Sequence, residues 1–313
     1  MVSSELRQVE ATIVEELQSD APEVEKLLLH SRELGGKRIR PALLLLCGKA
    51  AGELSEGHIY GAAALEMIHL ATLIHDDVLD NAQHRRHKVT AHAKFGVRPG
   101  VLLGDYLFTH SFSVGSKSNS VAVVQMLAQA SNLVCEGEIK QNAWQSDFSI
   151  CEADYFKMVS EKTGELCAAG CGIGAVLSGV DADSVSDFEA FGRDIGTAFQ
   201  IIDDVLDLVG DPKAVGKTLG TDLQNRKITL PVIHALKTLE ANPRKELLDL
   251  LVAETVPVAE VLAVLNETGS IDYSRQVAKS IVERAIGFAK GLPQSEASEA
   301  LLAMGSMLLK RTY

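Results

Sequence analysis

Residues 57–80 read GHIYGAAALEMIHLATLIHDDVLD, a segment that is apolar on most of its faces until it reaches Asp76, Asp77 and Asp80. Apolar residues recur along it at spacings of three and four, which is typical of an α-helix. A helix that is apolar nearly all round belongs in the interior of a bundle. We therefore predict a buried helix that ends in a cluster of carboxylates.

The same pattern extends over the rest of the chain. Long apolar helices are expected over Val121–Gln141, Ala153–Gly179 and Ser184–Leu208, while the residues from about Pro243 are more charged and predict outer, amphipathic helices. No alternating apolar and polar run bounded by hairpin turns is found, so strands are not expected. Because no linker or break in composition interrupts the pattern, the sequence predicts an all-α fold in a single domain, residues 1–313.

Composition and charge limit the kinds of partner and the cellular location that we expect. The 313 residues hold 30 Lys+Arg and 42 Asp+Glu, a net charge of −12, which disfavours nucleic acid and anionic membranes as general partners. The five Cys include no Cys-x-x-Cys pair and the N-terminus lacks a signal peptide, so we expect reduced thiols in a cytoplasmic protein. The longest uncharged stretch, residues 166–180, is shorter than the roughly 20 residues of a transmembrane helix.

The acidic motif that ends the predicted helix at residues 57–80 occurs a second time in the sequence. Residues 76–80 and 203–207 both read DDVLD, and each copy closes a long apolar helix. Residues four apart share a helix face, so Asp76 lies beside Asp80 and Asp203 beside Asp207, where like charges and the helix C-terminus both disfavour carboxylates. A cation removes that repulsion, and an all-oxygen ligand set favours Mg²⁺.

Basic clusters accompany these acids. They are found at 35–41 (GGKRIRP), 84–88 (HRRHK), Lys217 and 226–227 (RK). Arg and Lys match phosphate oxygens, so the combination favours a metal-bridged polyphosphate over nucleic acid. A zinc site at His84, His87 and His92 is disfavoured, since those residues lie in a basic turn without a Cys partner.

In this order, the motifs resemble those of the trans-isoprenyl diphosphate synthases, also called the polyprenyl synthetase family. The resemblance runs from Gly35 to Pro231 and is carried by GGKRIRP, IHLATLIHDDVLD, the Arg pair at 85–86, KTGEL at 162–166 and FQIIDDVLD at 199–207. It implies a single large helical bundle around a deep central cavity, with the two aspartate motifs facing each other. It also implies Mg-dependent, head-to-tail condensation of isopentenyl diphosphate with an allylic diphosphate, that is, a prenyltransferase.

Carried over residue by residue, the resemblance implies two substrate sites. The residues that match isopentenyl diphosphate-binding positions are Lys37, Arg40, His69 and Arg86. Those that match positions for the allylic prenyl diphosphate are Arg85, Lys162, Thr163, Gln200, Lys217 and Lys227. The acids that match the ligands of three Mg²⁺ ions are Asp76, Asp80 and Asp203, which with Lys162 and Lys217 form the implied catalytic set.

Other acids and two loop positions have subsidiary roles in this comparison. Asp77, Asp204 and Asp207 match hydrogen-bonding partners. The chain also departs from the family, which often has Gly and Pro where His87 and Val89 stand here, and Gly where Arg226 precedes Lys227.

Product length is predicted from the residues ahead of the first motif. No aromatic residue stands among the candidates for the tail's path, which are Ala71, Thr72, Ile68, Met67, Met126 and Leu127. Small side chains leave room for a long tail, so we expect a product of about C30 to C45, with a C20 geranylgeranyl product as the alternative. The family resemblance also implies a homodimer, with helices of the Val121–Gln141 region at its interface.

Two proteins of other classes remain as alternatives. A terpene cyclase shares the fold and the first motif, but it usually has a different second metal motif and needs no GGKRIR-like site. A non-catalytic subunit of a two-component synthase loses the acidic motifs, which are intact here.

Overall fold

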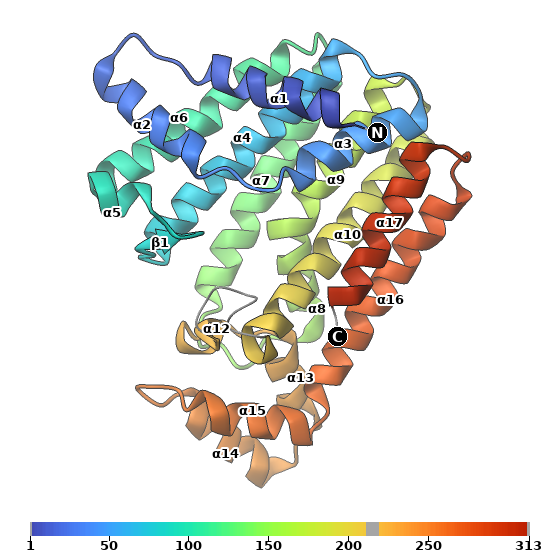
Figure 1. Ribbon diagram of the computed structural model, residues 1–313. Coiled ribbons are helices and arrows are strands. Elements are labelled where there is room, and N and C mark those ends of the chain that lie inside the picture. The colour runs from blue at the N-terminus through green and yellow to red at the C-terminus, as the bar shows by residue number, and fades with distance from the viewer. Residues whose placement is uncertain (1, 211–218, 312–313) are drawn as a thin grey trace. The chain divides into compact units, whose positions relative to one another are not determined.

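The structure, a computed structural model, describes residues 2–210 and 219–311 (Figure 1). The chain divides into two compact units. The first comprises the residues up to 131 together with 166–192 and 291–301. The second comprises 132–165, 193–290 and the residues from 302 onward.

The first unit is almost wholly helical. Its elements are α1 (Ser3–Glu16), α2 (Pro22–Glu33), α3 (Ile39–Ala51), α4 (Glu56–Leu79), β1 (His84–Arg85), β2 (Lys88–Val89), α5 (Ala91–Phe95), α6 (Val97–Ser116), the start of α7 (Val121–Ala143), nearly all of α9 (Glu165–Leu177), and the beginnings of α10 (Ala182–Val209) and α17 (Glu296–Arg311).

Helix α4 forms the core of this unit, where it packs against α1, α3, α5 and α6. Glycines allow close approach: a Cβ on Gly61 would lie 3.0 Å from Ile173 of α9, and one on Gly174 would lie 2.2 Å from the carbonyl oxygen of Leu44. The N-terminus of α4 is capped by His58, whose Nδ1 accepts from the Ser55 N–H (3.0 Å) and whose Nε2 donates to the Gly174 carbonyl (3.1 Å). The helix that ends in the first acidic motif is therefore fixed at its far end.

The second unit is also helical among its described residues. Its elements are the rest of α7, α8 (Glu152–Val159), η1 (Ser160–Gly164), the remainder of α10, α12 (Thr221–Gln224), α13 (Leu230–Thr238), α14 (Ala241–Leu251), α15 (Val258–Glu267), α16 (Ser270–Gly291) and the end of α17. Helix α13 packs against α8, α14 and α15. In the described residues, no helix has both the length and the hydrophobicity that crossing a membrane requires.

The all-α prediction is confirmed, with two local corrections. The predicted helix Ala153–Gly179 contains a π-helical turn, η1, between α8 and α9. The expectation of no strands is wrong at residues 84–89, where His84 pairs with Val89 and Arg85 with Lys88 in an antiparallel hairpin. Both loop residues, Arg86 (φ 50°) and His87 (φ 65°), have a left-handed backbone conformation, which is the geometry of a type I′ turn.

Candidate active site

The first acidic motif forms the C-terminal end of α4. Asp76 is half-buried in the last turn, and Asp80 is the exposed C-cap residue, whose N–H donates to the Asp76 carbonyl (2.8 Å). Asp77 points inward and is 1 % exposed, and its Oδ1 accepts from Arg85 Nε (2.8 Å). The structure therefore brings Arg85, a predicted diphosphate-binding residue, against this motif.

Burial shapes the chemistry of Asp77. It raises the pKa of the carboxyl, while the Arg85 guanidinium acts in the opposite direction. In the described part of the chain, the buried Oδ2 of Asp77 has no hydrogen-bond partner. One oxygen of Asp77 is thus used to hold Arg85, as expected for a hydrogen-bonding partner.

The predicted isopentenyl diphosphate residues gather around His69. Arg40 Nη1 donates to His69 Nε2 (3.0 Å), which leaves the ring proton on Nδ1. Burial, and then Arg40 and Arg86, hold the pKa of His69 well below its usual range. Arg86 lies over the backbone of Gly36, where an added Cβ would be 2.3 Å from its Nη1. Lys37 is exposed at the edge of this group.

The candidate chain-length residues on α4 lie within the helix core. Met67, Ile68 and Ala71 are fully buried, while Thr72 is half-buried and its hydroxyl donates to the His69 carbonyl (2.8 Å).

The two candidates on α7 point in different directions. A Cβ on Gly115 would lie 2.7 Å from Leu127 and 3.5 Å from Ala64, so Leu127 faces the α4 side. The Cε of Met126 lies 2.5 Å from the position of a Cβ on Gly172, so Met126 faces α9.

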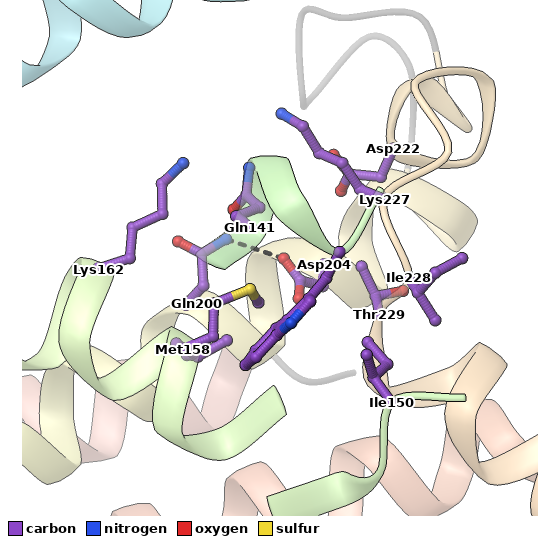
Figure 2. Close-up of a pocket in the computed structure, with 12 residues that line it drawn as sticks. Gln141, Ile150, Met158, Lys162, Gln200, Asp204, Asp222, Lys227, Ile228 and Thr229 are labelled. Carbon is purple, nitrogen blue, oxygen red and sulfur yellow. Dashed lines mark hydrogen bonds between the residues drawn. The ribbon is translucent and has the colours of Figure 1, made fainter. Parts of the chain in front are cut away.

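A pocket of about 90 Å³ lies within the second unit (Figure 2). Its lining residues are Gln141, Trp144, Ile150, Met158, Val159, Lys162, Gln200, Asp204, Asp222, Lys227, Ile228 and Thr229. Figure 2 shows Gln200 and Asp204 joined by a hydrogen bond, with Lys162 to one side and Lys227 and Asp222 to the other. Three predicted allylic-site residues, Lys162, Gln200 and Lys227, thus line one pocket.

A hydrogen-bonded series orders the pocket wall. The Thr163 hydroxyl donates to Gln200 Oε1 (3.1 Å), and Gln200 Nε2 donates to Asp204 Oδ1 (2.8 Å). The hydroxyl of the buried Tyr155 donates to Asp204 Oδ2 (2.6 Å). Burial, followed by the nearby Asp222, raises the pKa of Asp204 to about 8, against the two hydrogen bonds that lower it. Asp204 therefore serves as a hydrogen-bonded anchor for Gln200.

Lys162 and Thr163 lie in the π-turn η1, which packs on α7. A Cβ on Gly137 would lie 2.6 Å from the backbone N of Lys162. Lys162 of η1 forms an ion pair with Glu138 of α7, and Lys140 of α7 forms one with Glu161 of η1. Each of the two elements thus supplies one Lys and one Glu to the contact. The π-turn widens the helix and is common at functional sites.

The second acidic motif ends α10. Asp203 is half-buried, and Asp207 accepts from the Thr221 hydroxyl and from the Asp222 N–H (3.0 Å), which fixes the N-terminus of α12. The Lys227 N–H donates to the Asp222 carbonyl (2.8 Å). Lys217, predicted for the same site, lies outside the described residues.

The donors present fit a metal that the substrate helps to hold. Within residues 2–210 and 219–311, no three His, Cys, Asp or Glu side chains form a ready-made metal cage. Mg²⁺ usually takes only one or two carboxylates and completes its shell with water and phosphate oxygens. In the first unit Asp76 and Asp80 supply oxygen donors of that kind, and in the second unit Asp203 does so.

Sequence reasoning missed several residues at the pocket. Gln141 and Trp144 line it and carry no motif of their own. Tyr155 is not a lining residue but donates to Asp204, and in the sequence it reads simply as an apolar position of a helix. Asp222 lies between the second acidic motif and the basic pair at 226–227 and belongs to neither, although it lines the pocket.

Comparisons with known proteins agree with the motifs. A family model described as polyprenyl synthetase matches residues 21–268. The octaprenyl diphosphate synthase of Escherichia coli is 34 % identical over 99 % of this chain and 97 % of its own length. The short chain isoprenyl diphosphate synthase of Methanocaldococcus jannaschii is 38 % identical over 84 % of this chain and 83 % of its own.

Solved structures show the same fold. A decaprenyl diphosphate synthase from Rhodobacter capsulatus has a TM-score of 0.93 and 30 % identity, covering 100 % of this chain and 97 % of that one. A polyprenyl synthase from Caulobacter crescentus, complexed with calcium and isoprenyl diphosphate, has a TM-score of 0.92 and 31 % identity, covering 100 % and 96 %.

Proposed function

The chain belongs to the polyprenyl synthetase family, and from this membership we propose that it is an all-trans polyprenyl diphosphate synthase. It lengthens an allylic diphosphate by head-to-tail condensation with isopentenyl diphosphate. The observation that carries the proposal is the pairing, on one helix, of the carboxylates Asp76 and Asp80 with a neutral His69 surrounded by arginines. Carboxylates for a metal and cations for a diphosphate are what this reaction requires.

The chain's own residues orient two diphosphates. We assign isopentenyl diphosphate to Arg40, His69 and Arg86, with Lys37 at the rim. Neutral His69 donates through Nδ1, and the guanidinium groups supply forked donors that match phosphate oxygens. We assign the allylic diphosphate to Lys162, Gln200 and Lys227, with Arg85, Thr163 and Lys217 completing the set. Lys162 leaves Glu138 in order to reach that diphosphate.

The allylic carbon–oxygen bond breaks, the diphosphate departs with the electron pair, and a carbocation remains. The isopentenyl double bond attacks this cation to form the new carbon–carbon bond, and the proton then lost passes to the released diphosphate. The lysines stabilise the departing oxygens because they are placed before charge develops. Buried apolar residues of α4, among them Ile68 and Ala71, keep water from the cation. Asp76, Asp80 and Asp203 would hold the metal, three Mg²⁺ ions in our proposal, which supplies further neutralisation of the leaving diphosphate when bound.

We propose a product of about C30 to C45, since no aromatic side chain stands among the tail-path candidates. The octaprenyl diphosphate synthase of Escherichia coli and the decaprenyl diphosphate synthase structure are both similar to this chain over nearly its whole length, which supports the longer product over C20.

The test is incubation with Mg²⁺, an allylic diphosphate of C10 to C20 and labelled isopentenyl diphosphate, followed by chromatography of the dephosphorylated products. We expect label in chains longer than C20 and none when the metal is chelated. No incorporation with any starter contradicts the function, and products that stop at C20 contradict the length.

Three further properties belong to the same proposal. The chain acts as one domain, it forms a homodimer through the α7 region, and it is cytoplasmic. Light scattering coupled to size-exclusion chromatography tests the dimer, and cell fractionation tests the location.

A further inference from the structure

The hairpin at residues 84–89 carries Arg85 and Arg86, yet it has little to hold it in shape. It contains two residue pairs, and both loop residues are left-handed. Five of its six residues are exposed: His84, Arg86, His87, Lys88 and Val89. An isolated two-stranded hairpin is marginal in water, so the position of its arginines depends on what anchors it.

One anchor lies on the α4 side. Arg85 donates to Asp77 (2.8 Å), and the Thr90 hydroxyl donates to the Ala82 carbonyl (2.7 Å). These bonds fix β1 and the residue after β2. They do not reach Arg86, whose guanidinium lies against Gly36.

The second anchor is the C-terminal end of α2, and His30 is its buried part. His30 is 5 % exposed, and its Nε2 lies 3.0 Å from the Val89 carbonyl oxygen, while its Nδ1 lies 3.2 Å from Lys94 Nζ. A carbonyl only accepts and an ammonium only donates, so the ring carries its proton on Nε2 and is neutral. Lys88 Nζ also donates to the Glu33 carbonyl (2.5 Å).

The packing around the ring supports the same arrangement. Phe95 of α5 meets His30 edge-on with ring centroids 5.3 Å apart, so the ring fills a fixed place between α2 and α5. Burial, and then the Lys94 ammonium, lower the pKa of His30, in agreement with a neutral ring.

We propose that His30 is a positioning residue, which holds β2 against α2 through the Val89 carbonyl and thereby places Arg86 for isopentenyl diphosphate. The proposal rests on the proposed function. It predicts a selective effect, because Asp77 holds Arg85 directly, whereas the place of Arg86 depends on how β2 is held against α2 by the His30–Val89 contact and by the exposed Lys88, which donates to the Glu33 carbonyl.

The test compares His30→Leu with two matched variants. His30→Gln keeps a donor near the end of the side chain. Lys94→Met removes the contact to His30 Nδ1, together with the ammonium over the Phe95 ring, and leaves the Val89 contact in place. For His30→Leu we expect the KM for isopentenyl diphosphate to rise about tenfold, because a misplaced Arg86 loses one charge-assisted hydrogen bond to the diphosphate. The KM for the allylic substrate and kcat should stay within about twofold, and both matched variants should stay close to the unaltered protein. Equal rises in both KM values, or no rise, would overturn the proposal.

A double-mutant cycle shows whether His30 acts through Arg86. In an Arg86→Ala background, His30→Leu should add less than about a twofold further rise, because the residue it positions is gone. A further rise as large as that in the unaltered background contradicts the proposal.

Hydrogen exchange separates this inference from the proposed function. The peptide spanning residues 84–90 should exchange faster in His30→Leu than in His30→Gln, whether or not the protein turns over substrate. Unchanged exchange overturns the positioning role, whereas an inactive unaltered protein overturns only the function.

Discussion

At two positions where the family often has glycine, His87 and Arg226, this chain has a larger residue with a left-handed backbone conformation. Arg86 and His87 form a two-residue turn with φ of 50° and 65°, and Arg226, just before Lys227, has a φ of 56°. A side chain in this region costs roughly 1–2 kcal/mol, and glycine avoids that cost. The glycines common in the family at the places of His87 and Arg226 are therefore the residues that the backbone favours, and this chain carries strain at Arg86 and beside Lys227, the two residues proposed above to bind phosphate.

Replacing His87 with glycine should relieve that strain. We expect His87→Gly to stabilise the hairpin by about 1 kcal/mol, measured as slower hydrogen exchange of residues 84–90. His84→Gly is the control, since His84 lies in a strand and not in the loop, and it should speed exchange. Faster exchange in His87→Gly would contradict the turn assignment.

A single residue on α4 tests the tail's path. Ala71 is fully buried, so Ala71→Phe should shorten the product by obstructing the space beside α4, at a cost in stability of about 1–3 kcal/mol. Product chromatography measures the length, and Met126→Phe provides a comparison that faces α9. If the product distribution of Ala71→Phe matches the unaltered protein, the tail runs elsewhere.

At the scale of the element, the close contact between α7 and the π-turn sets the place of Lys162. All three atoms nearest to a Cβ on Gly137 are backbone atoms of Glu161 and Lys162, at 2.6–3.1 Å, and backbone cannot rotate away as a side chain does. The turn must therefore shift if that glycine is replaced, and Lys162 and Thr163 shift with it. A change outside the pocket is transmitted directly to residues that line it.

We expect Gly137→Ala to lower kcat/KM for the allylic substrate by at least about tenfold, since a displaced group close to the reacting atoms loses its alignment. Gly287→Ala in α16 is the matched control: nothing lies within 4 Å of its added Cβ, so it should stabilise the protein by up to about 1 kcal/mol. Normal activity in Gly137→Ala would show that η1 accommodates the methyl group.

The buried cap of α4 makes stability depend on pH. Burial lowers the pKa of His58, so the unfolded chain binds a proton near pH 6.5 and the folded chain binds it only at a lower pH. Stability from this group is therefore present above pH 6.5 and is lost as the pH falls. His58→Gln should reduce the slope of unfolding free energy between pH 7 and 5 by up to about 1.4 kcal/mol per pH unit, measured by denaturant titration. An unchanged slope would contradict a neutral His58.

Much of the secondary structure was predictable from the sequence, and the elements that were not have physical reasons for it. Helix-period hydrophobicity located α4, α7 and α10 to within two residues, because each buries a continuous apolar face. The π-turn was not predictable, since Ser160–Gly164 continues the helical pattern and only contact with Gly137 reveals it. The Arg86–His87 turn lacks the Asn-Gly signal of a type I′ loop, so the hairpin was missed. Tyr155 was missed because its partner Asp204 lies 49 residues away.

At the scale of the whole molecule, long helices belong to both compact units. Residues 182–192 of α10 belong to the first unit and residues 193–209 to the second, and α7 is divided in the same way near residue 131. Neither unit can unfold without ending a helix in mid-course, where the broken turn leaves backbone groups unpaired.

We therefore expect one cooperative thermal transition, as the single-domain proposal requires. Calorimetric and van't Hoff enthalpies should agree within error, and probes of the two units should report the same midpoint. Two separate transitions would show that the units fold independently and would contradict one domain. Excess Mg²⁺ with inorganic diphosphate should raise the midpoint of the same transition, since a ligand that binds only the folded state stabilises it.

Trp144, the only tryptophan of the chain, lines the pocket beside Asp204 and Lys227. Its indole is thus a natural optical reporter at one defined place, free of overlapping signals from other indoles. Titration with the allylic diphosphate should alter its fluorescence. The emission wavelength and intensity then report the occupancy of this pocket without any attached dye.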